Sequence, residues 1–130
     1  MRPHRAITRL RSGLLDEVRT LVGAVVPRPP GVPEHWVPSH GDLNPWNLRR
    51  ARTGDWLIDW EDAGWAPPGT DEVYFSATSA TLRRGAVQPL PIAPEHREAA
   101  ARLAAWVAAR PVRDRIGAQL QILLSNGSVE

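Results

Sequence analysis

The sequence predicts an α+β domain that is mostly helical and contains one small β-hairpin. Apolar side chains recur with the spacing of one helix face along residues 10–25, and helical patterns return at 71–82 and 95–109. Between the first two helices, the runs NLRRA (47–51) and DWLID (55–59) flank a turn that contains glycine, which is typical of a hairpin. The 130 residues suit one domain or a part of one.

The prolines divide the first half of the chain. Pro27 ends the first helix, because proline and the residue before it disfavour helical continuation. Residues 27–38 are rich in proline and are predicted to form an extended connection without a helix or a central strand. After the hairpin, residues 60–70 are predicted to be a loop, and Asp71 is predicted to be the N-cap of the helix that runs to about Leu82.

The second half follows the same logic. Residues 84–94 are predicted to form another proline-rich loop before the helix at 95–109. Pro111 suits the first position of a further helix over residues 112–124. Residues 125–130 are expected to be a disordered tail.

Composition excludes several classes of protein. With 42% hydrophobic and 23% charged residues, the chain can form a packed core. The absence of cysteine excludes disulfides and thiolate chemistry and fits the cytoplasm, where we expect the protein. No apolar run reaches the roughly 20 residues of a membrane span, and no secretory signal is evident. We therefore expect no membrane partner.

The charge pattern does not predict a nucleic-acid partner. The net charge is only +2, and the sequence pI is about 10.3 because every basic side chain is arginine and none is lysine. The basic clusters at 49–52 and 83–84 are short, and a nucleic-acid interface would need a longer basic surface with interleaved aromatic residues.

Four polar residues near the hairpin carry the predicted chemistry. Asp42 comes two residues after His40 and five before Asn47, and Asp59 follows at the end of the second predicted strand. The hairpin would bring the side-chain oxygens of Asn47 and Asp59 together, and such oxygens suit Mg²⁺. Asp42 would then accept the proton of a substrate hydroxyl, as in phosphoryl transfer. His40 would fix the loop by packing and hydrogen bonding.

Structural interpretations of the same residues remain open. Asp42 could belong to a turn at Asn44-Pro45, Asn47 could cap a strand, and Asp59 could be a solvated charge at the edge of the hairpin. The tryptophans of this region are predicted to pack in the core or between lobes rather than to stack on bases; they are Trp46, Trp56, Trp60 and Trp65.

Two motifs in order resemble those of one enzyme family. HGDLNPWNL, followed by LIDWEDAGWAPPGTDEVYF, resembles the aminoglycoside phosphotransferase and choline kinase-like family, whose members are distant relatives of protein kinases. HGDLNPWN is similar to the catalytic loop H-G-D-x-x-x-x-N, and IDWE is similar to the metal-binding segment I-D-[FW]-E. The resemblance covers about residues 36–82.

The resemblance implies a protein-kinase-like fold and an ATP-dependent phosphotransferase that uses Mg²⁺ and acts on a small-molecule hydroxyl. It implies Asp42 as the catalytic base and Asn47 and Asp59 as Mg²⁺ ligands. Asp71 would tie its helix to the catalytic loop, with His40 also supporting that loop.

The chain also departs from this family. Members carry a smaller β lobe with a phosphate-covering loop and an essential lysine, whereas this chain has no lysine and no glycine-rich loop before His40. We therefore expect the C-terminal lobe alone, without the N-terminal β lobe, and no independent activity. It would be a gene fragment, a degenerate relative, or half of an enzyme whose other lobe is a separate chain.

Other classes remain as alternatives. The chain could be a non-catalytic binding or interaction module built on the same lobe, and an uncovered cleft face would favour self-association. A two-metal phosphoesterase would need more histidine ligands than this region offers.

Overall fold

The computed structural model describes residues 9–52, 54–82, 90–109 and 128–129. Three α-helices form there: α1 (Leu14–Val25), α2 (Thr70–Ala80) and α3 (Arg97–Ala108). The strands are short; they are β1 (Val37–Ser39), β2 (Leu48–Ala51), β3 (Gly54–Leu57), β4 (Gly64–Ala66), β5 (Pro91–Ile92) and β6 (Ser128–Val129). The predicted α+β class is confirmed.

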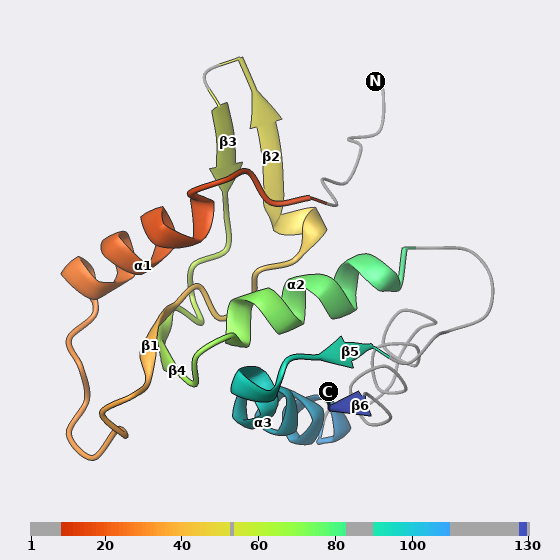
Figure 1. The fold of residues 1–130 in the computed structure, drawn as a ribbon. Coiled ribbons are helices and arrows are strands. Elements are labelled where there is room, and N and C mark those ends of the chain that lie inside the picture. Colours follow the sequence, from red (N-terminus) through yellow and green to blue (C-terminus); the bar gives the residue numbers. More distant parts are fainter. Residues whose placement is uncertain (1–8, 53, 83–89, 110–127, 130) are drawn as a thin grey trace.

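The strands pair two by two. The hairpin β2–β3 is antiparallel, with Leu48 opposite Leu57, which confirms the predicted hairpin. It extends away from the helices in Figure 1. Strands β1 and β4 are also antiparallel, with Val37 opposite Ala66, whereas β5 and β6 are parallel. No α-helix in the described residues combines the length and apolar character that a membrane-spanning helix needs.

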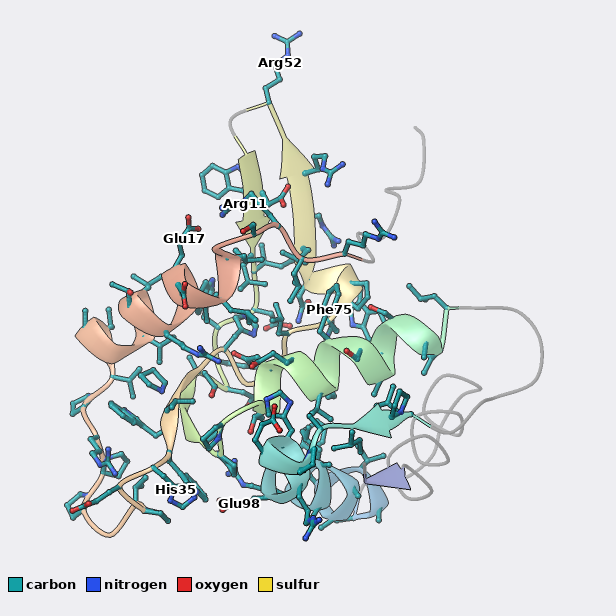
Figure 2. The ribbon with its side chains drawn as sticks, viewed as in Figure 1. Arg11, Glu17, His35, Arg52, Phe75 and Glu98 are labelled. Atoms are coloured by element: carbon teal, nitrogen blue, oxygen red, sulfur yellow. The ribbon has the colours of Figure 1, made fainter. Side chains whose placement is uncertain are left out.

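Helix α2 is the central element, because it packs on two separate apolar clusters (Figure 1). Its Phe75 joins the cluster formed with α1, and Figure 2 shows this side chain on the α1-facing side of α2. Its Val73, Tyr74 and Ala77 join the cluster formed with α3. A helix covered on both sides needs apolar residues around most of its circumference, and most positions of α2 are buried.

Several element boundaries differ from the sequence prediction. Residues 27–36 contain no helix or strand, but β1 follows directly in the segment that was expected to be an unpaired connection. Strand β4 lies inside the predicted loop 60–70, and β5 lies inside the predicted loop 84–94. These strands have two or three residues each, which is too short for a period-two pattern to reveal.

The ends of the helices also differ. The first helix begins at Leu14 rather than residue 10, after Gly13 in a left-handed conformation. A 3₁₀ turn over Pro94–His96 precedes α3, which ends at Ala108. The predicted helix 112–124 lies outside the described residues. Strand β6 falls within the predicted disordered tail, and the rest of that tail is not described.

The tryptophan prediction is wrong in one case. Trp56 on β3 is 60% exposed and is not a core residue. Trp60 packs at the margin of the α1 cluster, and the indole nitrogen of Trp65 donates a hydrogen bond to the carbonyl of Val26. Trp56 faces outward because the isolated hairpin has one face without a covering layer in the described residues.

Two valines on α1 test the packing of the α1 cluster. Val22 is 2% exposed and Val25 is 70% exposed. We expect Val22→Ala to lower the free energy of unfolding by about 2 kcal/mol, because it leaves a cavity in the cluster. Val25→Ala carries the same helix-propensity change and should stay within about 0.5 kcal/mol of the wild type. Urea denaturation measures both, and equal losses would contradict this packing.

Candidate active site

The loop of residues 40–47 connects β1 to the hairpin, and a buried histidine anchors it. The side chain of His40 is fully buried, and its Nε2 donates a hydrogen bond to the carbonyl of Ile58 over 2.9 Å. Its Nδ1 accepts a hydrogen bond from the backbone N–H of Asp42. These partners require the neutral Nε2–H tautomer. The ring also makes an edge contact with Trp60 at 4.6 Å between centroids. His40 thus joins this loop to the segment after the hairpin.

Asp71 holds the loop from the opposite side. Its buried carboxylate accepts the backbone N–H of His40 over 2.8 Å and of Gly41 over 3.1 Å. Burial raises the pKa of Asp71, while the two backbone hydrogen bonds lower it. The prediction that Asp71 caps α2 is wrong: the N-cap is Gly69, with a φ of 88°, and Asp71 lies in the first turn. Its carboxylate is directed to the loop instead of to its own helix.

Gly41 allows the loop to pass close to the next segment. Its φ is 91°, and a Cβ atom there would come within 2.3 Å of the carbonyl oxygen of Asp62. A side chain at this position would therefore clash with backbone, which cannot move aside as a flexible side chain can. The segments 40–42 and 60–63 approach each other because residue 41 is glycine.

Hydrogen bonds from neutral groups orient the carboxylate of Asp42. The amide Nδ2 of Asn44 donates to its Oδ1 over 2.9 Å, and the Nδ2 of Asn47 donates to its Oδ2 over 3.2 Å. Burial raises the pKa of Asp42, and hydrogen bonds from Tyr74, Asn47 and Asn44 and the charge interaction with His40 lower it. A carboxylate with a raised pKa is a better proton acceptor than a free one.

Asn47 ends a short 3₁₀ turn and begins the hairpin. Its backbone N–H donates to the side chain of Asn44, which caps the turn, and its carbonyl accepts the N–H of Ile58 over 3.0 Å. Asn47 therefore lies opposite Ile58, one residue before Asp59. The NH₂ group of Asn47 also donates to the carbonyl of Asp42. The amide oxygen is the end of this side chain that could bind a cation.

Asp59 has an unusual backbone conformation. Its φ is 65°, and it is the one non-glycine residue with a positive φ in the part of the chain that the structure describes. Asp and Asn tolerate this conformation better than other side chains. Asp59 is exposed, whereas Asn47 is buried. The hairpin thus brings the backbones of the two proposed metal ligands to the same end of the ladder.

The donor set fits Mg²⁺ better than a transition metal. Across residues 9–52, 54–82, 90–109 and 128–129, no group of three or more His, Asp or Glu side chains could hold a metal. Mg²⁺ favours one or two protein oxygens together with water and substrate phosphates. One amide oxygen from Asn47 and one carboxylate from Asp59 are of this kind.

A cavity of about 210 Å³ lies beside the loop. Gly41 and Asp62 contribute to one wall, Trp65 and its neighbours in the β1–β4 sheet to another, and Arg102 and Trp106 of α3 to a third. The cavity therefore connects the residue before Asp42 with the face of α3.

The wall formed by α3 is held in place by the connection before β1. Glu98 accepts hydrogen bonds from the ring Nε2 of His35 over 2.9 Å and from the indole nitrogen of Trp36 over 2.8 Å. Figure 2 labels His35 and Glu98, which lie near the lower end of this connection, beside α3. The guanidinium of Arg102 stacks over the ring of Trp36 at 4.8 Å.

Two residues of this site were not predicted from the sequence. Asn44 orients Asp42 and caps the turn, and its position directly before a proline was the available signal. Tyr74 follows Asp71 by three residues, so the helical repeat places both on one face of α2. Asp71 had been predicted to act within its helix, so this face was not examined for further contacts with the loop.

Comparison with family models now places the chain. Residues 4–113 match the phosphotransferase enzyme family, and the chain belongs to this family. Its members generally depend on ATP and Mg²⁺ and have a protein-kinase-like fold. Comparisons with curated proteins and with solved structures gave no significant match.

Gly41 and Gly31 form a matched pair that tests the close approach of the loop. Both have a φ near 90°, but a Cβ at Gly31 would meet no atom within 4 Å. We expect Gly31→Ala to cost about 1–2 kcal/mol of unfolding free energy, from backbone strain alone. Gly41→Ala should cost clearly more, because it adds a clash with the carbonyl of Asp62. Thermal and urea denaturation measure both, and equal costs would show that the loop is not packed in this way.

Asp71 predicts a pH dependence of stability. The unfolded carboxyl ionises near 3.8, and the folded carboxyl ionises at a higher pH because burial raises its pKa. Between these values the folded protein binds more protons, so the stability contributed by this group is present below 3.8 and is lost as the pH rises through the raised pKa. Asp71→Asn removes this titration.

Urea denaturation from about pH 4 to 7 measures the effect. The unfolding free energy of the wild type, relative to Asp71→Asn, should fall as the pH rises across this range. A difference that stays constant or grows with pH would contradict a raised pKa for Asp71.

Proposed function

We propose that this chain carries the catalytic and metal-binding residues of an ATP- and Mg²⁺-dependent phosphotransferase that acts on a hydroxyl group of a small molecule. One observation carries the proposal. The buried hydrogen bond from His40 to Ile58 ties the loop of Asp42 and Asn47 to the segment of Asp59. Family membership supports phosphotransferase activity in general, and this contact supports the assignment of the residues.

Asp42 is the proposed base. Its carboxylate would accept the proton of the acceptor hydroxyl while the hydroxyl oxygen forms a bond to the γ-phosphorus and the bond to ADP breaks. Asn44 and Asn47 hold both carboxylate oxygens through hydrogen bonds, which limits rotation of the group. Asn47 and Asp59 would hold Mg²⁺, which neutralises charge on the phosphates when it is bound.

The cavity beside Gly41 is the proposed acceptor site. Trp65 and Trp106 offer aromatic walls, and Asp62 and Arg102 offer hydrogen-bonding groups of both charges. A small polar molecule with several hydroxyls suits such a lining, since its ring or carbon face can pack on an indole while its polar groups bind at the rim. The identity of the acceptor, including an aminoglycoside, is not decided by this lining.

We also propose that a nucleotide-covering lobe comes from residues other than these. None of the 130 residues is a lysine, whereas the family's phosphate-binding lobe uses one. The exposed apolar side chains of Trp56 and Ile58 lie on the hairpin next to Asp59, and Leu21 and Val25 are exposed on α1. A lobe that closed over the metal site would bury part of this surface. Such an enzyme would meet ATP in the cytoplasm.

Calorimetric titration with ATP tests the metal site. We expect Mg²⁺-dependent binding with a dissociation constant on the order of millimolar or tighter, and no binding when the metal is chelated. Asp59→Ala should abolish binding because it removes a metal ligand. Asp16→Ala, which removes an exposed acid from α1, should leave binding unchanged.

Each outcome of this titration is informative. Binding that needs Mg²⁺ and Asp59 supports a metal site formed by these residues. Binding that survives Asp59→Ala refutes the proposed ligand. A folded chain that does not bind at all favours a non-catalytic module derived from a phosphotransferase.

A further inference from the structure

Tyr74 is the tyrosine of this chain, and its ring lies between α3 and the catalytic loop. It is 6% exposed, and it contacts Trp106 of α3 edge to face with 6.0 Å between ring centroids. The chain contains no second tyrosine. A buried phenol normally directs its hydroxyl to a hydrogen-bond partner, because burial of an unpaired hydroxyl is costly.

The geometry of α2 explains which partner it finds. Asp71 binds the backbone of His40 and Gly41, so the first turn of α2 lies against the residues just before Asp42. Tyr74 follows Asp71 by three residues, on the same face of the helix. Its hydroxyl makes a hydrogen bond with the carboxylate of Asp42.

Tyr74 therefore adds a third donor to this carboxylate. Asn44 donates to Oδ1 and Asn47 donates to Oδ2, and both come from the same loop as Asp42. Tyr74 alone among the three comes from a helix, and it is wedged against Trp106. A group that is fixed to rigid elements holds a reacting side chain better than one that belongs to the same loop.

We propose that Tyr74 is a positioning residue for the base, which holds the Asp42 carboxylate from α2 so that its remaining acceptor position faces the substrate hydroxyl. This inference rests on the proposed function in so far as Asp42 is the base. The hydrogen bond itself does not depend on that function. Because Trp106 also lines the acceptor cavity, Tyr74 connects the cavity wall to the base.

The single tyrosine makes the contact directly measurable. Labelling the full chain with tyrosine enriched in ¹³C at Cζ gives one carbon signal, whose chemical shift moves toward that of tyrosinate when the hydroxyl donates to a carboxylate. Asp42→Asn replaces the charged acceptor by a weaker neutral one, so the signal should move toward that of a free phenol. Asp62→Asn removes a nearby acid of the cavity and should leave the signal in place. A signal that ignores Asp42→Asn, or responds equally to both variants, overturns the inference.

Kinetics in the active enzyme test the consequence. Tyr74→Phe keeps the ring and its contact with Trp106 and removes the hydroxyl. We expect kcat to fall by about 10- to 100-fold, as for the loss of one hydrogen bond to a charged group, while KM for the acceptor stays within about twofold. An unchanged kcat, or a loss confined to KM, would refute a role at the base.

The two proposals can fail separately. If the carbon signal responds to Asp42→Asn but the chain never binds Mg²⁺–ATP, the contact stands and the phosphotransferase proposal fails. If Mg²⁺–ATP binds and the signal does not respond, the Tyr74 inference alone fails. Circular dichroism of each variant checks that it is folded.

Discussion

The rest of the site depends on one buried carboxylate, that of Asp71, which accepts the backbone N–H groups of His40 and Gly41. These two N–H groups could not be left unpaired in the interior without a large cost, and a carboxylate satisfies both at once. The cost is an ionised group held away from water, which is why burial raises the pKa of Asp71. The contact fastens the central helix α2 to the loop that carries Asp42, and every other hydrogen bond of the loop is built on this placement.

From this anchor, the chain brings three segments together. His40 reaches across to Ile58 and so joins the loop to the segment after the hairpin, and Gly41 lets the same segment pass close by. Tyr74 and Asp71 both act from α2, one on the carboxylate of Asp42 and the other on the backbone before it. The proposed base is thus held by neutral donors and by a rigid helix, while the proposed metal ligand Asp59 stays exposed at the end of the hairpin.

Local patterns predicted the elements that have a strong local signal. The hairpin β2–β3 follows from a glycine turn between two apolar runs, and the ends of α1 and α3 follow from Pro27 and from helical spacing. Strands β1 and β4 were missed because they have three residues each and pair across Val37 and Ala66, far apart in the sequence. Asp71 was placed at the wrong position in its helix because an acid before an apolar run is typical of an N-cap, whereas Gly69 takes that position with a left-handed backbone.

The sequence by itself determined the chemical groups and their order, since HGDLNPWN and IDWE place an acid, an amide and a second acid around a hairpin. It also determined the family, to which residues 4–113 belong. Only the tertiary structure decided what orients these groups: the partner of Asp71, the cap provided by Asn44, and the contact between Tyr74 and Asp42. The physical reason is that a hydrogen bond between residues about thirty positions apart leaves no periodicity in the sequence and exists only once the helix and loop have packed.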